Sequence, residues 1–190
     1  MASDYIIIVS GLPRSGTSMM MQMIEAGGMQ VLVDNVRRAD EDNPRGYYEF
    51  EPVKKTKEDP SWLAGAAGKA VKMVYRLLYD LPRDRQYRVV FMQRDLAEVV
   101  ASQELMLARQ AGGGDGLAPA QAVELFRSQL RRFELWAARQ PHIAVLTVHY
   151  ADAIADPLRE AGRVAAFLGG GLDAAAMAAA VAPSLYRNRR

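Results

Sequence analysis

The sequence has 190 residues, of which 50% are hydrophobic and 24% are charged, a balance that excludes a disordered or fibrous chain and fits one globular domain over residues 1–190. Its 24 basic residues stand against 22 acidic ones, and the net charge of +2 gives no reason to expect nucleic acid or an anionic membrane as a partner. Cysteine is absent, which excludes disulfides, thiol catalysis and zinc–thiolate sites.

The first predicted element is a strand. The apolar run at residues 5–9 ends at Ser10 and Gly11, which is typical of a strand buried on both faces of a parallel sheet. This run is too short to cross a bilayer and no basic segment precedes it, so we expect no membrane segment and a soluble, cytoplasmic protein. Good helix formers fill residues 18–26 and stop at two glycines, which predicts a helix.

The middle of the chain alternates again between strand and helix patterns. Residues 34–62 are rich in charges, prolines and aromatics, which predicts an irregular excursion or short helices. Apolar runs predict strands at residues 69–75 and 87–93, and the second is followed by a helix from residue 96 to about residue 110.

Asp95 and Glu98 mark the start of that helix. They have the N-cap and third-position spacing of a capping box, in which each side chain bonds a backbone N–H at the helix start. The helix is therefore predicted to begin directly after Arg94.

The last third of the chain completes the alternation. A glycine-rich connector at residues 111–117 precedes a predicted helix at 119–139, a strand at 143–148 and a helix at 157–168. A short helix is predicted at residues 173–181. Strands that alternate with helices indicate an α/β fold with three αβα layers and a central, mostly parallel sheet.

The glycine-rich turn at residues 11–18 joins the first predicted strand to the first predicted helix. Glycines at such a junction let the backbone curl, so that N–H groups and the helix N-terminus point at one anion. A purely structural turn is the alternative, but three hydroxyls and an arginine favour anion binding. The candidate binding residues are Arg14, Ser15, Gly16, Thr17 and Ser18.

The spacing of Gly11 and Gly16 is that of a nucleoside-triphosphatase P-loop, with one difference. Thr17 stands where the phosphate-binding lysine is expected. In addition, the strand at 87–93 leads into Arg94, where a magnesium-binding carboxylate is usual. We therefore predict no metal requirement, and keep a P-loop kinase-like phosphotransferase as an alternative.

Two motifs together resemble a known family. Residues 11–18 (GLPRSGTS) are similar to the 5′-phosphosulfate-binding loop of the sulfotransferases that use 3′-phosphoadenosine-5′-phosphosulfate (PAPS). Residues 94–102 (RDLAEVVAS) are similar to the 3′-phosphate-binding element of the same family, with an arginine at a strand end and a serine eight positions later. A softer similarity covers residues 148–152, 156–157 and 167–169.

The resemblance implies a P-loop-like fold and transfer of a sulfuryl group from PAPS to a hydroxyl or amine of a small-molecule or glycan acceptor. It implies that the amides of residues 15–18 hold the 5′-phosphate, that Arg14 stabilises charge on the bridging oxygen, and that Arg94 with Ser102 binds the 3′-phosphate. Basic C-terminal residues such as 186–190 fold onto that phosphate in the family. A non-catalytic adenosine-bisphosphate-binding module is the second alternative.

The general base is sought among carboxylates and histidines, because the acceptor must lose a proton during transfer. Some branches of the family use a glutamate after the first helix, which makes Glu49 the first candidate and Glu51 the second. His142 and His149 are the alternatives. Lys72, on the strand predicted at residues 69–75, is a candidate for neutralising the transferring group.

Overall fold

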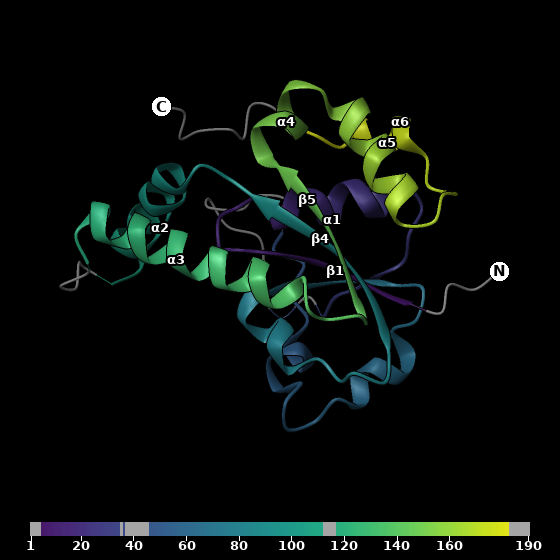
Figure 1. Cartoon of the computed structure of the whole chain (residues 1–190). Helices are drawn as coiled ribbons and strands as arrows, with labels where there is room; N and C mark the ends of the chain where they lie inside the picture. Colours follow the sequence, from purple (N-terminus) through teal and green to yellow (C-terminus); the bar gives the residue numbers. More distant parts are fainter. Residues whose placement is uncertain (1–4, 35, 37–45, 112–116, 183–190) are drawn as a thin grey trace.

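The structure is a computed structural model that describes residues 5–34, 36, 46–111 and 117–182 (Figure 1). Three sequence predictions therefore fall wholly or partly outside the described residues. They concern the charged excursion predicted at residues 34–62, of which 35 and 37–45 are not described, the connector predicted at residues 111–117, of which 112–116 are not described, and the basic tail at residues 186–190.

The described strands form one parallel sheet of five strands in the order β2-β3-β1-β4-β5. They are β1 (Tyr5–Gly11), β2 (Val31–Leu32), β3 (Ala70–Val74), β4 (Gln86–Gln93) and β5 (Ile143–His149). Four of them confirm predicted strands. The sequence analysis missed β2, since two residues are too few to show a period.

Helices account for most of the remaining described chain. The α-helices are α1 (Thr17–Ala26), α2 (Leu96–Ala111), α3 (Pro119–Ala137), α4 (Tyr150–Ala155), α5 (Pro157–Phe167) and α6 (Ala174–Ala179). Three short 3₁₀ helices are η1 (Glu51–Lys55), η2 (Ser61–Gly65) and η3 (Tyr75–Asp80). Helix η1 agrees with the short helices predicted in the charged excursion and η2 begins at the end of that excursion, whereas η3 and α4 were not predicted.

The sheet separates two hydrophobic cores, as the predicted three-layer fold requires. Alternate residues of β1 enter opposite cores, with Ile6 and Ile8 on one face and Ile7 and Val9 on the other. Helices α1, α5 and α6 cover the second face, and α3 with the 3₁₀ helices covers the first (Figure 1). The α/β fold class with a central parallel sheet is confirmed.

Helix α2 begins where the sequence predicts. The Oδ1 of Asp95 accepts hydrogen bonds from the backbone N–H groups of Ala97 at 2.9 Å and Glu98 at 3.0 Å, so Asp95 is the N-cap residue. The carboxylate of Glu98 has a contact that the capping box does not predict. It accepts a hydrogen bond from Nε of Arg94 at 2.8 Å.

None of the described helices combines the length and the apolar character that a bilayer crossing requires.

Phe133 of α3 anchors the first core. Its ring is 1% exposed and stacks on Phe91 of β4, with ring centroids 4.5 Å apart.

Replacing Phe133 by alanine removes this packing and leaves a cavity, so we expect Phe133→Ala to lower the free energy of unfolding by about 3–5 kcal/mol. Urea unfolding measures the loss. The matched control is Leu135→Ala, on the same helix but 56% exposed, which should change stability by less than about 0.5 kcal/mol. Equal effects of the two variants would contradict this account.

Candidate functional site

The glycine-rich loop lies at the carboxyl edge of the parallel sheet. Gly11, the last residue of β1, pairs with Val74 at the end of β3 and with Met92 near the end of β4. Parallel strands end at the same edge, and open α/β sheets bind ligands there. The structure therefore positions residues 11–18 beside the ends of two neighbouring strands.

Two positions in this loop strongly favour glycine. A Cβ on Gly11 would lie 2.6 Å from the carbonyl oxygen of Met92, because β1 and β4 pair closely there. Gly16 has a φ of +99°, and a Cβ on it would lie 2.4 Å from the ring of Tyr150. The tight curl of the loop therefore depends on these two glycines.

The loop presents backbone and hydroxyl donors at the start of α1. The first backbone bond of the helix runs from the N–H of Met20 to the carbonyl of Gly16, so the N–H groups of the preceding turn have no intrahelical acceptor. The N–H of Ser15 donates to the carbonyl of Leu12. The Ser15 hydroxyl is buried, and within the described part of the chain it has no hydrogen-bond partner. A phosphate oxygen at this turn would supply the missing acceptor.

Arg14 joins the loop to α2. Its Nε donates a 2.9 Å hydrogen bond to Oγ of Ser102, a residue that is 88 positions away in the sequence and 3% exposed. Arg14 itself has a left-handed backbone with a φ of +72°. The structure thus brings the loop into contact with the serine of the second sequence motif.

Arg94, the arginine of the second motif, also reaches the loop. Its Nη1 donates to the carbonyl of Arg14 at 3.4 Å, its Nε donates to Glu98, and its Cζ lies 4.7 Å from the ring centroid of Tyr150. The Arg94 side chain is only 10% exposed. Both motifs predicted to bind one nucleotide therefore converge at one place.

Tyr150 is part of this site and was not singled out by the sequence analysis. Its ring is 6% exposed and contacts both Gly16 and Arg94. Its position directly after β5, at the carboxyl edge of the sheet, is the signal that would have identified it.

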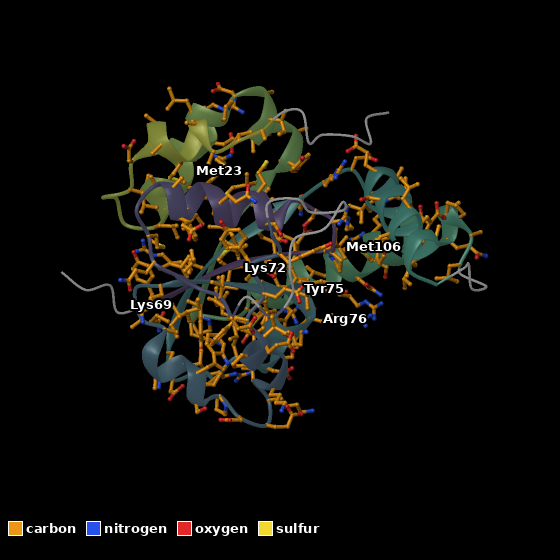
Figure 2. All side chains as sticks on the ribbon, turned by 180° about the vertical axis from the view of Figure 1, so that it is seen from behind. Met23, Lys69, Lys72, Tyr75, Arg76 and Met106 are labelled. Carbon is orange, nitrogen blue, oxygen red and sulfur yellow. The ribbon has the colours of Figure 1, made fainter. Side chains whose placement is uncertain are left out.

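The segment that precedes Glu49 is bound to the end of the loop. The carbonyl of Tyr47 accepts hydrogen bonds from Oγ of Ser18 at 3.3 Å and from Nζ of Lys72. Figure 2 shows Lys69, Lys72 and Tyr75 following β3 toward the side where α2 carries Met106. Lys72 and Glu49, both predicted site residues, therefore lie on segments that meet at Tyr47.

Two glutamates of this segment differ in exposure. Glu49 has a side chain that is 22% exposed, with Oε2 3.9 Å from Nζ of Lys54. The Glu51 side chain is 48% exposed and forms an ion pair with the same lysine. Asp34, which the sequence analysis missed, accepts from the N–H of Glu51 at 2.5 Å, and this bond together with one from the N–H of Val36 lowers the pKa of Asp34. An ionised Asp34 thus organises the backbone beside Glu49.

The two histidines lie at opposite ends of β5. His142 directly precedes the first residue of β5. It is buried and packs edge-on against Tyr87. Burial, together with the charge of Arg83, lowers the pKa of His142. His149 is exposed and ends β5 at the same edge as the loop. Of these two alternative bases, His149 is therefore the one on the side of the candidate site.

Comparison with known proteins found one family match and several solved structures with a similar fold. Residues 85–173 match the model of the sulfotransferase family. A sulfotransferase from Mycobacterium tuberculosis H37Rv superposes with a TM-score of 0.62 at 17% identity, over 94% of this chain and 71% of its own. A mouse sulfotransferase complexed with PAP superposes with a TM-score of 0.59 at 17% identity, over 94% of this chain.

A third similar structure is the sulfotransferase domain of the curacin biosynthetic pathway, with a TM-score of 0.51 and 14% identity, over 90% of this chain and 75% of that domain. The chain spans 64% of the length of the mouse protein. A search of curated proteins gave no match. The similar structures confirm the predicted fold.

Gly16 and Gly28 provide a test of how tightly the loop is packed. Both have a left-handed φ, +99° and +97°, and they lie at opposite ends of α1, but a Cβ on Gly28 would meet no atom within 4 Å. We expect Gly28→Ala to cost about 1–2 kcal/mol for the backbone conformation alone. Gly16→Ala should cost about 1–3 kcal/mol more because Tyr150 must move. Chemical denaturation measures both variants, and equal losses would show that Tyr150 does not constrain the loop.

Proposed function

We propose that this chain, whose residues 85–173 match the model of the sulfotransferase family, transfers a sulfuryl group from PAPS to a hydroxyl or amine of a small-molecule or glycan acceptor. The observation that carries the proposal is the convergence of Arg94 and Ser102 on the glycine-rich loop, through the contacts of both with Arg14. The two motifs are distant in sequence, and their meeting creates one basic site with two separate parts.

The two parts suit a nucleotide that carries one phosphate at the 5′ position and one at the 3′ position of its ribose. We assign the 5′-phosphate to the loop, where the amides of residues 16–18 at the N-terminus of α1 and the buried Ser15 hydroxyl provide donors, whereas the N–H of Ser15 already donates to the carbonyl of Leu12. The 3′-phosphate is assigned to Arg94 and Ser102. A nucleotide without a 3′-phosphate would leave this second, buried part without its ligand.

Arg14 lies between the two parts, since its backbone belongs to the loop and its side chain reaches Ser102. We propose that its guanidinium stabilises the negative charge that develops on the bridging oxygen as the S–O bond of the donor breaks. Lys72, which reaches the end of the loop through Tyr47, is proposed to neutralise charge on the transferring group.

Glu49 is the proposed general base. It would take the proton from the acceptor hydroxyl or amine as the acceptor atom bonds to sulfur and the bond to the 5′-phosphate oxygen breaks. The products are then the sulfated acceptor and adenosine 3′,5′-bisphosphate. Two features support Glu49 over Glu51. The side chain of Glu49 is the less exposed of the two, and it is closer in sequence to Tyr47, which contacts the loop.

The conditions of the reaction follow from the sequence. A sulfuryl group carries less charge than a terminal phosphoryl group, and β4 leads into Arg94 rather than a carboxylate, so we propose turnover without a metal ion. We propose the cytoplasm as its location, because a chain without cysteine suits a reducing compartment.

Nucleotide binding tests the donor class. Adenosine 3′,5′-bisphosphate should raise the melting temperature more than Mg-ATP does, because only the former places phosphates in both parts of the site. Arg14→Ala and Arg94→Ala should each weaken bisphosphate binding by about 1.5–3 kcal/mol in titration calorimetry, the range for hydrogen bonds to charged groups.

The matched control is Arg127→Ala, an exposed arginine on α3, which should leave the affinity unchanged. Unaltered binding in both site variants, or an equal thermal shift with Mg-ATP, would refute the assignment.

Glu49→Gln tests the base. Removing a general base should lower kcat by about 10²-fold or more, whereas the affinity for adenosine 3′,5′-bisphosphate should not change. Steady-state sulfation of an accepted hydroxyl compound measures kcat, and a chelator should not lower the wild-type rate. Glu51→Gln is the control and should retain most of the activity. If Glu51→Gln is inactive and Glu49→Gln is not, the base assignment is wrong.

A further inference from the structure

Glu98 contacts the arginine of the proposed 3′-phosphate part, although neither motif assigns it a role in binding. Its carboxylate is 2.8 Å from Nε of Arg94, and the two side chains are 6% and 10% exposed. We propose that Glu98 is a positioning residue that orients Arg94 toward the 3′-phosphate and thereby sets the preference for 3′-phosphorylated adenosine nucleotides. This inference rests on the proposed function.

The start of α2 holds Glu98 in place. Its backbone N–H donates to the N-cap carboxylate of Asp95 at 3.0 Å, which fixes Glu98 in the first turn. Arg94 precedes the helix, four residues before Glu98, and this is the spacing at which neighbouring side chains meet. A rigid helix start therefore carries the carboxylate that contacts the arginine.

Holding Nε determines where the rest of the guanidinium points. The group is planar and its donors form a fixed fork, so a bond at Nε sets the direction of the two terminal nitrogens. Tyr150 lies 4.7 Å from Cζ, and the carbonyl of Arg14 accepts from Nη1 at 3.4 Å. The contact with Glu98 thus fixes the orientation of the Arg94 guanidinium at Nε, while Tyr150 and the carbonyl of Arg14 contact other atoms of the same group.

Charge explains why a carboxylate serves here although the ligand is an anion. A buried guanidinium requires a partner when no nucleotide is bound, since an uncompensated charge in the interior is costly. The negative charge of Glu98 opposes a bound phosphate, so its contribution to binding must come from geometry. Glutamine keeps an oxygen that can accept from Nε, whereas aspartate keeps the charge but is one methylene shorter.

The experiment compares two nucleotides that differ only in the 3′-phosphate. Titration calorimetry gives Kd for adenosine 3′,5′-bisphosphate and for AMP with the wild-type chain and with Glu98→Gln, Glu98→Asp and Glu98→Ala. The preference for the bisphosphate is the ratio of the Kd for AMP to the Kd for adenosine 3′,5′-bisphosphate. We expect this ratio to fall about tenfold in the aspartate and alanine variants. Glu98→Gln should keep the ratio within about threefold of the wild-type value.

A control and the remaining outcomes complete the test. Glu104→Asp, at an exposed position of the same helix, should not change the ratio. An unchanged ratio in Glu98→Asp with both nucleotides weakened equally would assign Glu98 a purely structural role. An unchanged ratio without weakening, or a larger ratio, would also overturn the inference. If Glu98→Ala does not fold, the aspartate and glutamine variants decide. A wild-type chain without preference for the bisphosphate would instead refute the 3′-phosphate part itself, so the two failures are distinct.

Discussion

The parallel pairing of β1 with β4 is the constraint on which the candidate site depends. Gly11 pairs with Met92, so the glycine-rich loop and Arg94 leave the sheet from the same edge, close enough for Arg94 to donate to the carbonyl of Arg14. The next pairing, of β4 with β5, sets Gln93 opposite His149 and brings the following residue, Tyr150, to that edge. A shift in either register would separate these groups.

The buried position of β1 makes this arrangement rigid. Its side chains belong to both hydrophobic cores, so the strand that carries the loop is held from two sides. The loop and its surroundings contain features that are unfavourable in isolation and that a firmly held framework stabilises. Arg14 and Tyr48 have left-handed backbones, and Arg94 and Glu98 form an ion pair that is largely removed from water. Features of this kind concentrate where a protein binds ligands.

The proposed donor side and the proposed acceptor side of the site are connected through Tyr47. Its carbonyl joins Ser18 of α1 to Lys72 of β3, and the next residues lead to Glu49. Asp34 holds the same segment through the backbone of Glu51. The carbonyl that contacts the loop is therefore two residues away from the proposed base, so the proposed places of donor binding and proton removal share one connected segment.

The sequence by itself determined the alternation of strands and helices, the loop between β1 and α1, and the spacing that links Arg94 to Ser102. Each of these depends on residues within one element or one turn, where apolar period, glycine position and N-cap chemistry act locally. The tertiary structure alone decided that Arg14 contacts Ser102, that Tyr150 packs on Gly16 and Arg94, and that His142 lies at the far edge of the sheet. It also decided the pairing of β2, too short to show a pattern. Such contacts join residues as far as 134 positions apart, as Gly16 and Tyr150 are, and their partners are set by strand order and register, which no local pattern contains.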